Sequence, residues 1–162
     1  MKLDKTWFCD MVHEQQEELY RLAFHILKNK EDAEDALQET LFRAYSHLEQ
    51  VKHPKYFKTW ITRILLNAAF EIRRKRRSNL NLEDYEETVG NSEDIITMVM
   101  MENAVRELDE KYQHVIFLYY YENYSVKEIS EVLDVSVMNV KQRLSRSRKA
   151  LRKILEGQGK GV

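Results

Sequence analysis

The chain has 162 residues, of which 43% are hydrophobic, and a formal net charge of −1 at pH 7. Its single cysteine, Cys9, cannot form an internal disulfide, and no apolar run approaches the roughly 20 residues that span a membrane. The N-terminal residues are too charged for a signal peptide, so we expect a cytoplasmic protein. One proline and four glycines favour an all-α fold of long helices.

The small net charge conceals a strong segregation of charge along the chain. Residues 1–78 carry 15 basic and 12 acidic side chains, residues 79–110 carry one and 10, and residues 111–162 carry 10 and five. Residues 79–94 lack helical periodicity and any Lys or Arg, which predicts a flexible acidic linker. We therefore expect two small helical domains, residues 1–78 and 95–162, whose basic patches suit a polyanionic partner.

Helical spacing predicts the first two helices over about residues 6–28 and 31–48. In the second of them, an apolar stripe covers one side. The other side carries acidic and amide groups and one aromatic ring: Asp32, Asp35, Gln38, Glu39 and Phe42. A large exposed aromatic residue beside carboxylates indicates a protein-binding face. The alternative is a solvated acidic face on which Phe42 only covers a neighbouring helix.

A third helix is predicted over about residues 56–77, after a loop in which Pro54 suits the helix start. Its inward stripe contains Ile61, Ile64, Leu65, Ala68 and Ile72, and another face carries Arg63, Asn67, Phe70 and Arg74. The helix ends in the sequence R-R-K-R-R, which is more positive charge than the helix dipole needs.

The start of this third helix combines aromatic and basic residues. Tyr56, Phe57 and Trp60 lie close in sequence to Lys52, Lys55 and Lys58. Aromatic rings interleaved with cations are typical of surfaces that hold unstacked bases and their phosphates. Core packing is the alternative, and we expect at least one of Phe57 and Trp60 to point inward.

Beyond the acidic stretch, a helix is predicted from about residue 92, with its apolar positions at Ile95, Met98, Val99, Met101, Val105 and Leu108. Asp109 then starts a further helix, whose run F-L-Y-Y-Y at 117–121 supplies core for the C-terminal helices. Residues 125–155 predict two helices joined by a very short turn. Ser125 and Glu128 have the spacing of a capping box, and Ser136 can cap the second helix.

The second of these helices is strongly amphipathic. Val137, Val140, Leu144, Leu151 and Ile154 form its inward stripe, and Met138, Lys141, Gln142, Ser145, Arg146 and Lys149 form the other side. There are seven basic residues and no acidic one from Lys141 to Lys153. This arrangement indicates a DNA-binding helix-turn-helix. Because such patterns are degenerate, an amphipathic surface helix with a solvated basic face is the alternative.

Taken together, three segments resemble the extracytoplasmic-function (ECF) group of bacterial sigma factors. Residues 20–45 are similar to the family's polymerase-binding segment. F-K-T-W-I-T-R-I-L-L-N-A-A at 57–69 is similar to its −10 promoter-reading helix. Residues 107–121 and the helix-turn-helix after them are similar to its −35-reading domain. The order of these segments around an acidic linker makes the resemblance specific.

The resemblance implies roles for individual residues. The polymerase-binding residues would be Asp32, Asp35, Gln38, Glu39 and Phe42. The −10 residues, which include a pocket for a flipped base, would be Lys52, Tyr56, Phe57, Lys58, Trp60, Arg63, Asn67, Arg73, Arg74, Arg76 and Arg77. The −35 residues would be Ser125, Asn139, Lys141, Gln142, Arg143, Ser145, Arg146, Arg148 and Lys149.

The sequence departs from the family at three places. Asp134 occupies the turn of the helix-turn-helix, where glycine is common. Ser145 is small where some members carry an aromatic residue, so base preference there is not inherited. The loop at 49–58 differs in detail from that of many members, and in the family this loop helps to choose the −10 base.

The function implied is that of an alternative sigma factor, with no catalytic residues, cofactor, metal or small-molecule substrate. Its expected partners are promoter DNA, core RNA polymerase (the clamp coiled coil of the largest subunit and the β flap), and an anti-sigma factor that is often membrane-bound. The rivals are a plain DNA-binding regulator and an adaptor that binds proteins but no DNA. An enzyme fits least, because no phosphate loop, metal spacing or nucleophile–base pair occurs.

Overall fold

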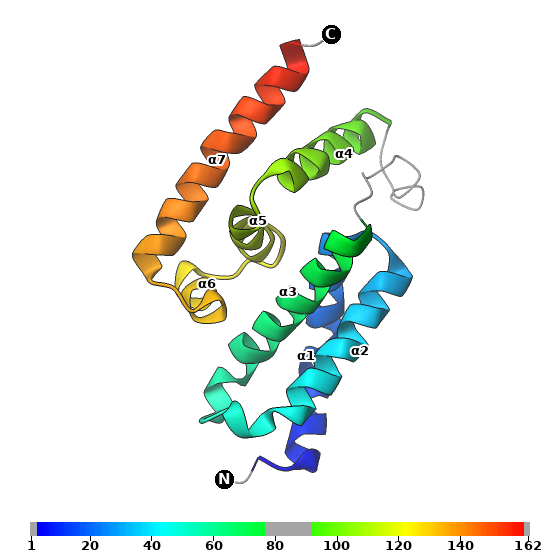
Figure 1. Cartoon of the computed structure of the whole chain (residues 1–162), viewed down its shortest axis with the longest axis vertical. Helices are drawn as coiled ribbons and strands as arrows, with labels where there is room; N and C mark the ends of the chain where they lie inside the picture. Colours follow the sequence, from blue (N-terminus) through cyan, green and yellow to red (C-terminus); the bar gives the residue numbers. More distant parts are fainter. Residues whose placement is uncertain (1–2, 77–91, 161–162) are drawn as a thin grey trace.

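The structure is a computed structural model, and it describes residues 3–76 and 92–160. Within these ranges the chain is helical and contains no strand. Three long helices come first: α1 (Lys5–Leu27), α2 (Lys30–Ser46) and α3 (Phe57–Arg76). Four helices form the second part: α4 (Ser92–Glu107), α5 (Glu110–Ile116), α6 (Val126–Leu133) and α7 (Val137–Lys160), with a π-helical segment, η4 (Phe117–Tyr121), after α5. Figure 1 shows α3 between α2 and α6.

The helices α1, α2 and α3 pack against one another as an N-terminal unit. Asn29 caps α2 by accepting a hydrogen bond from the Asp32 amide at 2.9 Å, and Lys28 turns the chain through a left-handed conformation. Leu22, Ile26, Ile61 and Leu65 are almost completely buried between the helices. Burying one such side chain contributes about 1.5–3 kcal/mol, so the apolar stripes hold this unit together.

Two short 3-10 turns, η1 (Leu48–Gln50) and η2 (Pro54–Tyr56), connect α2 to α3. Pro54 lies at the start of η2, and α3 begins three residues later, at Phe57. The prediction that Pro54 lies near the start of the third helix is therefore correct. Pro54 begins a 3-10 turn that precedes α3, however, and not the helix itself. The other predicted helix boundaries in this unit agree with the structure to within two residues.

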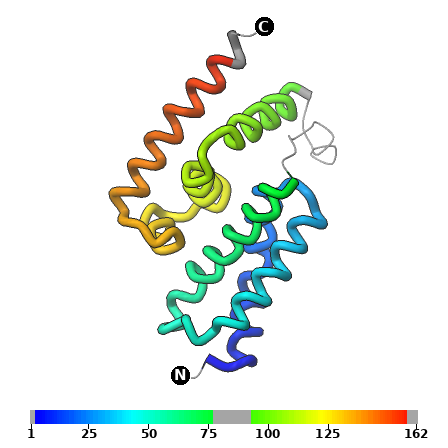
Figure 2. The backbone as a smooth tube through the Cα atoms, in the orientation of Figure 1, coloured from blue at the N-terminus to red at the C-terminus, as the bar shows by residue number. Residues whose placement is uncertain are grey.

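In the C-terminal unit, α7 packs on α4, α5 and α6 (Figure 2). Val105, Val115, Leu118, Ile129 and Val140 are its buried centre. The run at 117–121 forms core, as predicted, but only in part: Phe117 and Leu118 are buried, whereas Tyr120 is half exposed.

The two units pack directly against each other. α3 contacts α6, and α1 contacts η4. Lys28 and Glu102 form a nearly buried ion pair at 3.0 Å, and the Phe70 ring on α3 lies 6.2 Å from the Phe117 ring. One continuous apolar cluster runs through both units. The expected linker at 79–94 falls almost entirely outside the described residues, so its flexibility stays a prediction.

The structure corrects the predicted burial of several side chains. Phe70, expected on an outer face of its helix, is buried because the C-terminal unit covers that face. Met98 and Met101, two of the predicted apolar positions of α4, are each 39% exposed. Two further apolar side chains are largely exposed: Tyr45 near the end of α2 at 50%, and Val137, the first residue of the predicted inward stripe of α7, at 40%.

Candidate nucleic-acid interface

The helix-turn-helix at 125–155 is present as α6 and α7. Ser125 and Glu128 form a complete capping box: the Glu128 amide donates to Ser125 Oγ at 3.0 Å, and the Ser125 amide donates to Glu128 Oε1 at 3.1 Å. Ser136 Oγ accepts from the Asn139 amide at 3.0 Å and so caps α7. Both predicted caps are confirmed. They fix where each helix begins and therefore which residues of α7 face outward.

The turn between α6 and α7 depends on Asp134. This residue has a φ of 55°, in the left-handed region, and the next amide, that of Val135, donates to the Ser130 carbonyl at 3.1 Å. Aspartate tolerates this region better than most non-glycine residues. The turn therefore closes without the glycine that is common in the family.

One face of α7 presents most of the predicted −35 residues together. Lys141, Gln142, Ser145, Arg146 and Lys149 are all exposed. Their spacing of three and four residues places them along one side of the helix. This is the face that a recognition helix turns toward the major groove, with donors for base edges and cations for phosphates.

The other predicted −35 residues have different surroundings. Arg148 donates to the Tyr120 hydroxyl at 2.6 Å, and its guanidinium lies 5.7 Å from the centre of that ring. Asn139 and Arg143 are only partly exposed, and Ser125 is engaged in its cap. The structure thus separates the five residues on the exposed face of α7 from Ser125 and Arg148, which are exposed but already hydrogen-bonded, and from Asn139 and Arg143, which are only partly exposed.

At the predicted −10 surface, the aromatic residues divide between core and surface. Phe57 is completely buried, with its ring 5.1 Å from Trp7, which confirms that at least one aromatic residue points inward. Tyr56 is 46% exposed, and Lys55 lies over its ring. Trp60 is partly exposed and packs 5.9 Å from Phe57.

A polar hollow of about 280 Å³ opens beside Trp60. Residues of α2, η1 and α3 line it: Arg43, His47, Gln50, Trp60, Arg63, Ile64 and Asn67. An aromatic ring beside amide and guanidinium groups can stack on a base and hydrogen-bond its edge. Arg43, His47 and Gln50 were not predicted, because nothing in the spacing of α2 indicates that the end of this helix faces α3.

The basic residues of α3 are mostly paired with other parts of the protein. Arg63 donates to the Val132 carbonyl at 2.5 Å and to the Glu131 carbonyl at 2.7 Å, both at the end of α6. Arg74 pairs with Glu110 at 2.7 Å and Arg76 with Asp32 at 2.8 Å. The predicted basic cluster is therefore largely engaged within the protein, and Arg77 lies outside the described residues.

Arg73 is a further departure from a free basic cluster. Its guanidinium lies 5.3 Å from the Phe70 ring centre and 6.0 Å from that of Phe117. Burial, with a smaller contribution from Arg106, lowers the pKa of Arg73 to about 10. The side chain remains cationic near neutral pH and lies against two aromatic faces.

The predicted polymerase-binding face of α2 is exposed at four of its five positions. Asp35, Gln38, Glu39 and Phe42 point outward, and Phe42 is 70% exposed. Asp32 is the exception, because it is only 4% exposed and pairs with Arg76. The expected outward position of Asp32 is wrong, since the end of α3 covers it.

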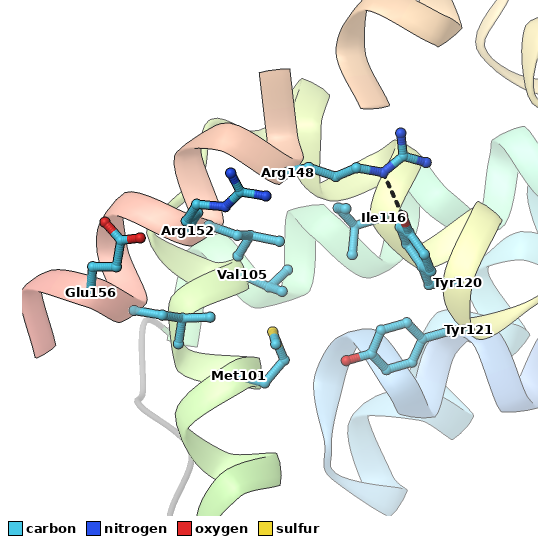
Figure 3. A pocket seen from close by; sticks show the side chains of 10 residues that line it. Met101, Val105, Ile116, Tyr120, Tyr121, Arg148, Arg152 and Glu156 are labelled. Carbon is cyan, nitrogen blue, oxygen red and sulfur yellow. Dashed lines mark hydrogen bonds between the residues drawn. The ribbon is translucent and has the colours of Figure 1, made fainter. Parts of the chain in front are cut away.

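An apolar pocket of about 670 Å³ lies between α4, η4 and α7 (Figure 3). Its walls include Met101, Val105, Ile116, Leu151 and Leu155, with Arg148 and Arg152 at its edge. The sequence pattern did not predict this pocket, because helical spacing identifies apolar side chains such as Met101 and Leu151 but not the space left between packed helices. None of the described helices has the length and hydropathy needed to cross a membrane.

These features define a helical DNA-binding protein with two candidate nucleic-acid surfaces. The sequence matches two families in the same order: Sigma-70 region 2 over residues 11–79 and Sigma-70, region 4 over residues 98–151. The chain belongs to the ECF RNA polymerase sigma factors of the sigma-70 family, whose members are transcription initiation factors and not enzymes.

Individual relatives agree with this assignment. The ECF RNA polymerase sigma factor SigW of Bacillus subtilis is 32% identical, in an alignment that covers 95% of this chain and 91% of SigW. The RNA polymerase sigma factor SigV of the same organism is 32% identical, covering 91% and 90% of the two chains. The fold resembles the sigma factor RpoE of Bartonella quintana, crystallised with the anti-sigma factor NepR, with a TM-score of 0.65, 20% identity and coverage of 92% and 96%.

Proposed function

We propose that this protein is an alternative sigma factor that binds core RNA polymerase, directs it to promoters with −35 and −10 elements, and helps to melt the −10 region. The observation that carries this proposal is the exposed face of α7, where Lys141, Gln142, Ser145, Arg146 and Lys149 stand on a capped helix-turn-helix. Lys141, Gln142, Ser145 and Arg146 would meet base edges, and Lys149 would hold a phosphate.

The hollow beside Trp60 supports the −10 role. Melting requires at least one base to leave the duplex stack, which costs a few kcal/mol. An aromatic ring with the side chains of Gln50 and Asn67 nearby offers a flipped base both stacking and hydrogen bonds. Lys52 and Tyr56, both exposed next to this region, would hold the opened strand.

Two surfaces suit protein partners. The exposed Phe42, flanked by Asp35, Gln38 and Glu39, fits a polymerase contact, which we assign to the clamp coiled coil of the largest subunit. The apolar pocket between α4 and α7 fits an apolar helix with acidic flanks, because Arg148 and Arg152 lie at its edge. We assign this pocket to the polymerase β flap.

We further propose that an anti-sigma factor, soluble or membrane-bound, controls this protein in the cytoplasm. The support is the shared fold with the sigma factor RpoE, which was crystallised with the anti-sigma factor NepR. A partner of this kind would have to cover the exposed faces of α2 or α7.

Reconstitution with core RNA polymerase tests the proposal. Polymerase with this protein is expected to give discrete run-off transcripts from a genomic promoter library, and polymerase alone is not. A Lys141→Ala/Arg146→Ala double variant should lose these transcripts, because it changes only residues on the exposed face of α7. Binding of the protein to DNA without any run-off product would instead identify a plain DNA-binding regulator and overturn the sigma assignment.

A further inference from the structure

The apolar pocket between α4 and α7 is only partly enclosed by the chain. Its volume is about 670 Å³, and its walls include Met101 and Val105 from α4 and Leu151 and Leu155 from α7 (Figure 3). Val105 is buried, whereas Met101 is 39% exposed. Apolar surface that stays exposed beside a large pocket marks an interaction site. We therefore expect an apolar partner to cover this side of the two helices.

The edge of this pocket carries side chains of both charges. Arg152 and Glu156 are both exposed there, four residues apart on α7 (Figure 3). Residues with this spacing lie on the same side of a helix, one turn from each other. An acidic partner would use Arg148 and Arg152 but would leave Glu156 facing a like charge. A surface that carries one acid and one base at the same spacing matches the edge better.

The pocket of a second copy of this chain is such a surface. When two α7 helices lie side by side in opposite directions, Arg152 of each copy comes opposite Glu156 of the other. The same pair of contacts then satisfies both edges. A surface that is complementary to itself in this way is what a two-fold symmetric dimer requires.

The helices α4 and α7 already have the arrangement of half a four-helix bundle. The 16 residues of α4 lie beside α7, and the two helices run in opposite directions (Figures 1 and 2). Two such pairs, packed pocket to pocket, would make a bundle of nearly antiparallel helices. Met98, which is 39% exposed, extends the apolar surface about one turn beyond Met101. Methionine side chains adapt readily to the shape of a facing surface.

We propose that two copies of this chain form a dimer in which the pockets face each other. α4 and α7 of both copies make a four-helix bundle, and Arg152 of each copy pairs with Glu156 of the other. Lys141 and Arg146 stay outside the bundle, because they lie in the other half of α7. The dimer itself does not depend on the proposed function. One consequence does: the dimer cannot offer this pocket to the β flap, so polymerase binds the monomer.

Charge reversal at the pocket edge tests the dimer. Arg152→Glu and Glu156→Arg each place like charges opposite one another at both edges. Sedimentation equilibrium over a concentration series should show the unchanged chain approach the mass of two chains. Each single variant should raise the dissociation constant of the dimer by about tenfold or more, since like charges across an interface are strongly unfavourable. Lys153→Glu, an exposed neighbour on α7 with the same change of two charge units, should leave this constant unchanged.

Mixing the two single variants separates contacts between copies from contacts within one helix. Arg152 and Glu156 are four residues apart in the same helix, so each reversal also changes α7 itself. Mixing restores only a contact between copies, because every reversed side chain then faces one of opposite charge. An equimolar mixture should therefore dimerise with about the affinity of the unchanged chain. Circular dichroism of each variant alone should show unchanged helix content, since both positions are exposed.

Three results would overturn the dimer. The unchanged chain could stay monomeric at every concentration, the single variants could dimerise as well as Lys153→Glu, or their mixture could stay monomeric. None of these results affects run-off transcription. A failure of the run-off assay, in turn, overturns the sigma assignment and leaves the dimer standing, so the two failures are distinguishable.

Discussion

The Asp32 carboxylate at the start of α2 lies 2.8 Å from the Arg76 guanidinium at the end of α3. Asp32 is 4% exposed, and burial raises its pKa, an effect that the charge of Arg76 opposes. The pair joins the start of α2 to the end of α3, on the side of the N-terminal unit opposite the turn between these helices (Figure 2).

Arg76→Ala should destabilise the fold by about 1–3 kcal/mol, because it leaves a buried carboxylate without its partner. The loss should shrink as the pH falls through the raised pKa of Asp32, since the protonated acid needs no counter-charge. Urea denaturation at pH 7.5 and at pH 4.5 measures both effects. Lys75→Ala, at the exposed neighbouring position, should change the free energy of unfolding by less than about 0.5 kcal/mol.

Asp35→Arg with Phe42→Ala should abolish retention by immobilised core polymerase. Both side chains are exposed, so the helix content and the midpoint of urea unfolding should stay as in the unchanged protein. Glu14→Arg, exposed on α1, is the control and should be retained normally. Retention of the double variant would show that α2 presents a different face to polymerase.

Arg146→Ala and Lys149→Ala should weaken DNA binding in different ways. If Arg146 contacts a base, its loss costs about 1–3 kcal/mol on the cognate −35 element and little on other DNA. If Lys149 contacts a phosphate, its loss weakens binding to all sequences. It also reduces the slope of log K against log salt concentration by about one. Binding titrations on cognate and scrambled duplexes at several salt concentrations distinguish the two. An equal loss on both duplexes for Arg146→Ala would make it a phosphate contact.

The stability of the protein should fall as the pH is lowered from about 6.5 toward 4. Burial lowers the pKa of His114 to about 4, and Arg143, Arg74 and Arg73 act in the same direction. Burial and the charges of Lys28 and Arg21 lower the pKa of His25 to about 4 as well. In this pH window the unfolded chain binds protons that the folded chain excludes, so acid favours unfolding.

Each of these two histidines should contribute a slope of at most about 1.4 kcal/mol per pH unit. His114→Phe keeps an aromatic ring beside Phe70 and should remove roughly half of the combined slope. Adding His25→Phe should remove the remainder. Urea denaturation at half-unit steps of pH provides the measurement, and an unchanged slope in the double variant would assign the pH dependence to carboxylates.

Local pattern was sufficient to predict the helices, both caps of the helix-turn-helix and the exposed face of α7. The capping box depends on two residues three positions apart, and the inward stripe of α7 on residues within a few turns of one another. Interactions of this kind are complete within a short segment. The α7 face at Lys141 and Arg146 could therefore be identified before any tertiary structure was known.

The features that pattern missed all depend on residues far apart in the chain. Phe70 has no local signal for burial, since the rings that contact it belong to His114 and Phe117. Asp32 is buried by Arg76, and Arg63 is held by carbonyls at 131 and 132. Periodicity shows which side of a helix a residue occupies, but it does not show what covers that side. Periodicity therefore could not predict the contact between the two units.

The binding of Arg63 to the end of α6 has a consequence for a freely diffusing copy of the protein. A genome offers on the order of 10⁶–10⁹ non-specific sites, which compete through phosphate contacts for any protein with exposed cations. A cation that is hydrogen-bonded within its own protein contributes little to this non-specific binding of DNA. While the units stay packed, more copies remain off random DNA and in the pool that can meet polymerase.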